Sequence, residues 1–208
     1  TTDFTEFDCV HIGEDSEDGE NGGRLFITME LVEGRSLKQL LDEGPLAIDR
    51  ALALAREILE ALKALHVLGI VHRDVKPANV LLDASGSVKL ADFGLARYGE
   101  RGDIRVTETE AMVGTLAYLS PEQALGREIT GRSDLYSFGV LLFEMIAGRL
   151  PFDQGSSVAT LVAHLNRAPA SLRSLRPETP RWLSSVVGRL LSKRPEDRYS
   201  SADEVLAD

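Results

Sequence analysis

Cysteine and long apolar runs are scarce in this sequence. Cys9 is the single cysteine among 208 residues, so no disulfide can form within the chain. No stretch approaches the roughly 20 consecutive apolar residues that cross a bilayer, and no secretory signal opens the chain. These absences predict a protein of a reducing compartment, the cytoplasm. The chain starts at Thr1 rather than at a methionine, so we expect it to be a piece of a longer parent protein, in which a membrane anchor or targeting segment could lie outside these 208 residues.

Positive charge is also scarce. The chain has 23 Lys and Arg against 33 Asp and Glu, a formal net charge of −10. Nucleic-acid binding needs a basic surface, so we expect no nucleic-acid partner. With 43% hydrophobic and 27% charged residues, the composition is that of a globular protein with a sizeable core, and the length allows one or two domains.

The first part of the chain predicts a hairpin and a short helix. Residues 14–23 combine acidic side chains with turn-forming Gly and Asn, which indicates an exposed loop. Strand-like segments at 7–12 and 24–32 flank this loop and could pair antiparallel. Ser36 is a typical N-cap for a helix that ends before Gly44.

The chain after Gly34 is predicted to be mostly helical. Apolar residues recur at helical spacing from Ile48 to Val67, which predicts an amphipathic helix. Short apolar runs at 80–82 and 88–90 predict a second hairpin. Residues 134–147 are apolar on almost every face, which is typical of a helix at the centre of a domain. Three more helices are expected, at 156–166, 181–192 and 201–207.

Two short motifs carry the chemistry. The loop after the long helix contains His72-Arg73-Asp74-Val75-Lys76-Pro77-Ala78-Asn79, and Asp92-Phe93-Gly94 begins 13 residues after Asn79. Phosphoryl transfer needs a carboxylate near the attacking hydroxyl, oxygen ligands for magnesium and a cation near the transferred phosphate. Each tripeptide alone is common, whereas the two in this order and spacing are specific. The structural alternative is that these polar residues only cap and stabilise loops.

Together these motifs resemble the catalytic loop and the DFG motif of protein kinases, with Val75 in place of the usual leucine. The resemblance implies that Asp74 is the catalytic base and that Lys76 contacts the γ-phosphate. It also implies that Asn79 and Asp92 bind magnesium. Lysine two places after the aspartate is similar to the serine/threonine branch of the family.

Further matches extend the resemblance along the chain. Ser120-Pro121-Glu122 stands where kinases carry an APE motif, and Arg198 matches the arginine that forms a buried ion pair with its glutamate. Asp134 matches the aspartate that holds the backbone of the catalytic loop. Thr115 matches a threonine that contacts the catalytic Asp and Lys. The matches for the adenine pocket are a gatekeeper, two hinge residues and a residue below the ring: Met29, Glu30, Val32 and Leu81.

The segment between Asp92 and Glu122 resembles an activation loop. Thr107 and Thr109 lie in its middle, like the paired threonines of bacterial kinases of eukaryotic type. Arg73 is the implied partner of a phosphate placed there. The alternative is that both threonines are ordinary polar residues of an exposed loop.

The resemblance also shows what is missing. No G-x-G-x-x-G occurs, and the first lysine, Lys38, lies beyond the expected hinge. We therefore expect an α+β, protein-kinase-like fold in which residues 1–34 are a short hairpin remnant of the small lobe and residues 35–208 are the mostly α-helical large lobe. The 208-residue chain by itself is expected to transfer phosphate very poorly, because nothing in it would cover the phosphates.

The implied function of the parent protein is ATP-dependent phosphorylation of serine or threonine in protein substrates, with ATP and Mg2+ as cofactors. The resemblance leaves dimerisation of the full-length kinase open. One alternative is a kinase-like regulatory or scaffold fragment without catalysis. A second alternative is a small-molecule phosphotransferase, which the Ser-Pro-Glu segment, Arg198 and the threonine-bearing loop disfavour.

Overall fold

The computed structural model describes residues 11–14, 25–28, 31–92, 116–152 and 155–208, which form two units, Thr1–Glu33 and Gly34–Asp208. The first unit contains strands β1 (His11–Glu14) and β2 (Leu25–Thr28). They pair antiparallel with His11 opposite Thr28, which confirms the predicted hairpin. The first strand extends two residues beyond the predicted segment 7–12, because its ladder with β2 continues to Glu14. Residues 7–10 lie outside the described part.

The second unit contains an antiparallel sheet in the order β3 (Gly34–Ser36), β4 (Val80–Asp83), β5 (Val88–Leu90). The predicted hairpin β4–β5 is confirmed. The sequence did not predict β3, because Gly-Arg-Ser has little strand propensity of its own. A glycine is required at its start, since a Cβ on Gly34 would lie 1.9 Å from the carbonyl oxygen of Leu82 on β4.

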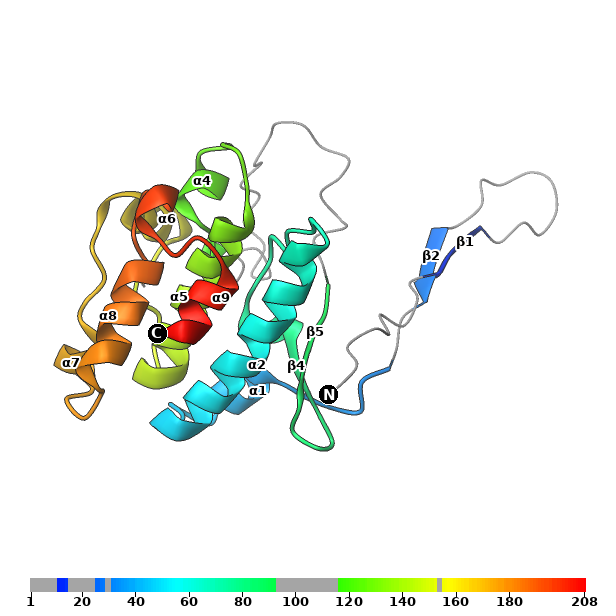
Figure 1. Ribbon diagram of the computed structural model, residues 1–208, viewed down its shortest axis with the longest axis horizontal. Coiled ribbons are helices and arrows are strands. Elements are labelled where there is room, and N and C mark those ends of the chain that lie inside the picture. Colours follow the sequence, from blue (N-terminus) through cyan, green and yellow to red (C-terminus); the bar gives the residue numbers. More distant parts are fainter. Residues whose placement is uncertain (1–10, 15–24, 29–30, 93–115, 153–154) are drawn as a thin grey trace. The chain divides into compact units, whose positions relative to one another are not determined.

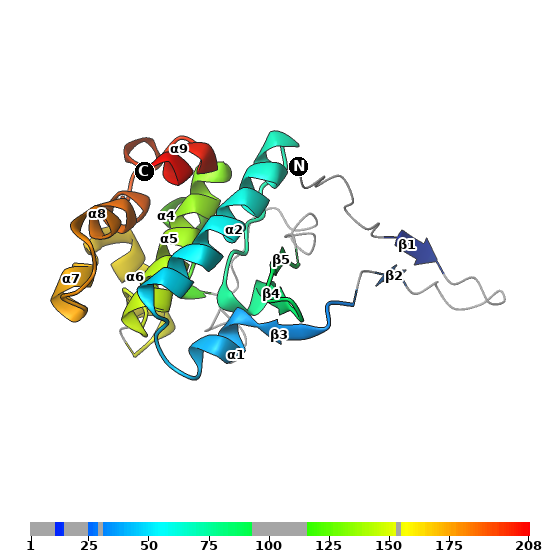
Figure 2. The ribbon, with the colours of Figure 1, turned by 60° about the horizontal axis from the view of Figure 1, so that its bottom comes forward.

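Helices α1 (Leu37–Leu41) and α2 (Ile48–Val67) follow β3, and the sequence predicts both helices. The Ser36 hydroxyl accepts the backbone N–H of Gln39, and the Gln39 side chain accepts the Ser36 N–H, so both groups cap α1 reciprocally. The α2 helix buries one apolar face against α5, α9 and β5. In both views it lies between the β4–β5 hairpin and the helices α5 and α9 (Figures 1 and 2).

Helix α5 (Gly131–Ala147) is buried on nearly every face, as the sequence predicts. It begins three residues before the predicted Asp134, because a capping box between Thr130 and Ser133 starts the helix earlier. It packs against α2 and α8, and Figure 1 shows it among the surrounding helices. Nine residues of α5 belong to the hydrophobic core of this unit.

The remaining predicted helices are α6 (Ser157–Asn166), α8 (Arg181–Leu190) and α9 (Ala202–Ala207). Their ends differ from the prediction by two residues at most. The sequence missed α4 (Pro121–Ala124), α7 (Leu172–Leu175) and the 3-10 turns η1 (Pro77–Asn79) and η3 (Pro195–Asp197), since three or four residues are too few to show a helical period. Among the described residues, no helix has both the length and the apolar character needed to cross a membrane.

Candidate active site

A buried carboxylate at the start of α5 holds the loop between α2 and β4. Asp134 is 1% exposed, and its two oxygens accept the backbone N–H groups of His72 and Arg73, each at 2.8 Å. The Nε2 atom of His66, in the last turn of α2, lies 2.8 Å from Oδ2 of the same carboxylate. A buried carboxylate is stable only with such partners. The contacts that the sequence predicts for Asp134 are therefore present.

Arg73 has an unusual backbone conformation, with φ of 70°. A residue with a Cβ is uncommon in this left-handed region and costs of order 1–3 kcal/mol when held there. Two contacts stabilise this conformation: its N–H donates to Asp134, and its carbonyl accepts Nε2 of Gln123 at 2.7 Å. The loop backbone is thus bonded both to α5 and to α4, which fixes the turn immediately before Asp74.

Two polar side chains contact Asp74. Its Oδ2 atom accepts Nζ of Lys76 at 2.7 Å and Nδ2 of Asn79 at 3.0 Å. The same Nδ2 donates to the backbone carbonyl of Asp74 at 2.9 Å. The carboxylate is 32% exposed and the lysine side chain 19% exposed. An oriented and partly exposed carboxylate can accept a proton from a bound hydroxyl, and a cation beside it can neutralise an anionic group.

His72 lies under this loop and is fully buried. Burial lowers the pKa of its imidazole, although the charges of Asp134 and Asp74 oppose the shift. The ring is therefore neutral at neutral pH. Its Nδ1 atom is 3.3 Å from the backbone N–H of Asp74 and accepts it, which adds one more fixed point to the loop.

Asp92 lies at the same end of the β4–β5 hairpin as Asn79. Val80 pairs with Leu90, and the N–H of Ala91 donates to the carbonyl of Asn79 at 2.9 Å. Asp92 follows directly, with φ of 55°. Both motifs are thus brought together by one short ladder.

The oxygen atoms of Asn79 and Asp92 fit a magnesium ion. Neither the carboxamide oxygen of Asn79 nor the Asp92 carboxylate accepts a hydrogen bond from the described residues, so both keep lone pairs. In this part of the chain no group of three His, Cys, Asp or Glu forms a self-sufficient metal cluster. One or two protein oxygens suit magnesium, which completes its octahedron with water and phosphate oxygens.

The ion pair predicted between Glu122 and Arg198 is present. NH1 and NH2 of Arg198 donate to the two carboxylate oxygens at 2.7 and 2.8 Å. The remaining N–H groups donate to carbonyls, so all five donors of this 2% exposed side chain are used. Burial raises the pKa of Glu122, but the hydrogen bonds from Arg198 and Ser133 outweigh it and hold the pKa below its usual range.

The structure describes only two of the four residues that the sequence predicts to bind adenine. Leu81 lies on β4 of the second unit and is half-buried, and Val32 belongs to the first unit. Five predicted site residues lie outside the described residues: Met29, Glu30, Thr107, Thr109 and Thr115. Their roles stay predictions.

Sequence reasoning missed His66 and Gln123. A histidine in the last turn of a helix is common, because its partial charge suits the helix C-terminus, so the pattern around His66 held no distinguishing signal. Gly131 makes room for it, since a Cβ there would lie 2.9 Å from Nδ1 of the ring. Gln123 did carry a signal: it stands three residues after Ser120, the spacing of a capping box, and that box is present at α4.

Comparison with known proteins agrees with this geometry. A family model described as protein kinase domain matches residues 10–208. A probable serine/threonine-protein kinase PknB of Lactococcus lactis is 41% identical over 194 residues, which cover 93% of this chain and 31% of that protein. Serine/threonine-protein kinase PksC of Streptomyces coelicolor is 44% identical over 196 residues (92% of this chain, 35% of that protein). Serine/threonine-protein kinase PrkC of Bacillus subtilis is 38% identical over 191 residues (91% and 29%), so the chain spans about a third of the length of these curated relatives.

Proposed function

The chain belongs to the protein kinase family, and we propose that it carries the catalytic loop of an enzyme that transfers the γ-phosphate of ATP to serine or threonine hydroxyls of proteins. One observation carries the proposal: Asp74 is held by Lys76 and Asn79 on a loop that Asp134 and Gln123 fix. We place the reaction in the cytoplasm, where ATP is abundant.

In this mechanism the Asp74 carboxylate orients the substrate hydroxyl and accepts its proton. Lys76 lies beside the carboxylate and neutralises charge on the phosphate during transfer. Magnesium, when bound with the nucleotide, supplies charge neutralisation at the phosphates, and Asn79 and Asp92 would hold it. The loop stays in place because its backbone is bonded to α4 and α5, so little reorganisation is needed when substrates bind.

The remaining predicted residues extend the same proposal. Residues 1–34 would be the small-lobe part, and the division of the chain after Glu33 supports this boundary. Its Met29, Glu30 and Val32 would bind the adenine, together with Leu81 from the large lobe. Thr115 would contact the catalytic pair.

A phosphorylation switch belongs to the same proposal. Phosphate on Thr107 or Thr109 would add about −1.5 to −2 charges and pair with Arg73. Mass spectrometry of the active full-length gene product should detect phosphate on one of the two threonines. Full activity after both are changed to alanine would contradict the switch.

The test is phosphate transfer by the full-length gene product, with Mg-ATP labelled at the γ-phosphate and a generic basic protein as substrate. Asp74→Asn should lower the rate by about 100-fold or more, because the proton acceptor is lost. Asp49→Asn, at an exposed site in the first turn of α2, is the matched control and should not change it. If the full-length gene product labels no protein, the result favours the scaffold alternative. Labelling of small molecules alone would favour the small-molecule phosphotransferase.

A further inference from the structure

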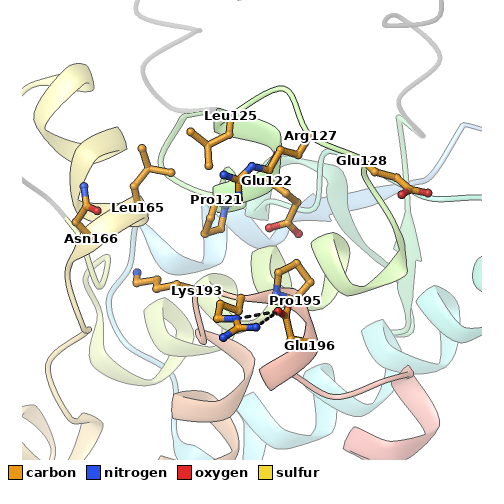
Figure 3. Close-up of a pocket in the computed structure, with 11 residues that line it drawn as sticks. Pro121, Glu122, Leu125, Arg127, Glu128, Leu165, Asn166, Lys193, Pro195 and Glu196 are labelled. Carbon is orange, nitrogen blue, oxygen red and sulfur yellow. Dashed lines mark hydrogen bonds and ion pairs between the residues drawn. The ribbon is translucent and has the colours of Figure 1, made fainter.

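A cavity of ≈ 470 Å³ lies between α4, the end of α6 and the segment that follows α8. Figure 3 shows Arg127 on the segment after α4, Leu165 on α6 and Lys193 on the segment after α8. None of Asp74, Lys76 and Asn79 lines it, so this cavity is separate from the phosphotransfer loop. We call it the Lys193 pocket.

The ammonium group of Lys193 has an apolar and poorly hydrogen-bonded environment. Nζ lies 4.1 Å from the centroid of the Phe152 ring and 5.8 Å from that of Tyr136. Its polar contacts are long, 3.5 Å each to the Tyr136 hydroxyl and the carbonyl oxygen of Ala163. Within the described ranges no carboxylate lies within ion-pair distance of Nζ, whereas Lys38, Lys63 and Lys76 each have one.

This environment favours the neutral amine. Burial, and then the charge of Arg198, lower the pKa of Lys193 to about 8, while the face of the Phe152 ring attracts the ammonium and opposes the shift. An ordinary lysine, with a pKa near 10.5, is almost wholly protonated at pH 8 and is then no nucleophile. Lys193 is one of the residues that line the cavity, which is large enough to hold a small electrophile.

One guanidinium in the pocket is available to an anionic reagent. Of the basic residues that line the pocket, Arg194 pairs with Glu196 and Lys193 reacts as the neutral amine, which leaves Arg127. Of the lining carboxylates, Glu122 pairs with Arg198, and Glu128 forms no ion pair within the described residues. Arg127 has no carboxylate partner in the described part of the chain, so its guanidinium is available for a phosphate.

We propose that Lys193 is a site of covalent modification, acylated at Nζ by small acyl phosphates that Arg127 binds through their phosphate. The neutral amine attacks the acyl carbon and forms an amide bond, and the carbon–oxygen bond to phosphate breaks. The proton released from nitrogen is taken up by the leaving phosphate, so acetyl phosphate yields acetyl-lysine and hydrogen phosphate. No oxidant or reductant is needed.

The test is to incubate the 208-residue chain with acetyl phosphate from pH 6.5 to 9.5 and to measure acetylation of each of its five lysines by peptide mass spectrometry. Lys193 should react at least tenfold faster than Lys38 and Lys63 at pH 8, and its rate should level off above pH 8 while theirs still rises. A rate or a pH profile equal to that of Lys38 overturns the proposal.

Arg127→Gln tests the recognition of the phosphate. The variant should acetylate Lys193 three- to tenfold more slowly with acetyl phosphate, and at an unchanged rate with the neutral N-acetoxysuccinimide. Equal rates of the variant and the parent with both reagents would overturn the role of Arg127, as would an equal loss with both. Arg127 is exposed and outside the core, so folding of the variant should match that of the parent by circular dichroism.

Discussion

Arg198 and Glu122 are 76 positions apart and form a buried, two-bonded ion pair, with N–O distances of 2.7 and 2.8 Å. The pair joins the start of α4 to the segment after α8. Because Gln123, the next residue, donates to the carbonyl of Arg73, the same short helix also reaches the loop that holds Asp74. A single change at Arg198 should therefore affect both stability and the position of the loop.

We expect Arg198→Met to lower the free energy of unfolding of the chain by about 3–5 kcal/mol, because it leaves the Glu122 carboxylate buried without a partner. Urea titration followed by circular dichroism measures this. Adding Glu122→Leu should recover much of the loss, since no charge then stays buried.

Arg189→Met is the matched control for that experiment. Arg189 forms an ion pair with Glu204 that is exposed to solvent on both sides. Such pairs contribute about 0–1 kcal/mol, so the change should be small. An equal loss in the two single variants would contradict the role assigned to the buried pair.

Asp134→Asn should destabilise the chain by roughly 3 kcal/mol, because one of the two backbone N–H groups that it accepts would then face an amide NH2. The substitution should also weaken the hydrogen bonds of the loop itself. Hydrogen exchange should show faster exchange of the His72 and Arg73 amides at concentrations of urea that leave α8 protected. Unchanged protection of these two amides would refute the anchoring role.

Two glycines in helices should respond in opposite directions to alanine. A Cβ on Gly139 of α5 would lie 2.7 Å from Cβ of Leu190 on α8, so Gly139→Ala should cost about 1–3 kcal/mol. Gly188 of α8 is exposed, and a Cβ added there would meet no neighbouring residue within 4 Å. Gly188→Ala should therefore raise the free energy of unfolding by about 0.5–1 kcal/mol through helix propensity. Thermal unfolding of both variants checks the two signs.

The buried His164 should make the folded chain less stable in mild acid. It is fully buried, with Nδ1 2.9 Å from the Tyr136 hydroxyl, and burial followed by the charge of Lys193 lowers its pKa from 6.5 to about 4. The unfolded chain therefore binds a proton below pH 6.5 that the folded chain binds only near pH 4. The stabilisation is present above pH 6.5 and is lost as the pH falls, by about 2 kcal/mol between pH 7 and pH 5.

The control is His164→Asn, which keeps a hydrogen-bonding group beside Tyr136 but does not titrate. Urea titrations at pH 7 and pH 5 should show a smaller difference in the free energy of unfolding for the variant than for the parent. The same difference in both proteins would mean that other groups cause the acid sensitivity.

The sequence by itself predicted the elements with a clear apolar pattern and the residues of the two motifs. The long helix Ile48–Val67 was predicted from the helical spacing of its apolar residues, and the hairpin β4–β5 from two short apolar runs. Asp74, Asn79 and Asp92 were predicted because their order and spacing are specific to one chemistry. The strand Gly34–Ser36 was missed because it contains no apolar residue, and the four-residue helices were missed because so few positions show no helical period.

Tertiary structure alone decided how the loop is held. His66 meets Asp134 across 68 positions, and Gln123 meets Arg73 across 50, so no local pattern could pair them. The left-handed backbone of Arg73 is held by hydrogen bonds to Asp134 and Gln123, which are both distant in the sequence. The low pKa of Lys193 likewise depends chiefly on its burial, which residues distant in the sequence provide in the packed fold. Local interactions determine helices and turns, whereas strain and unusual charge states need partners that only the packed fold brings close.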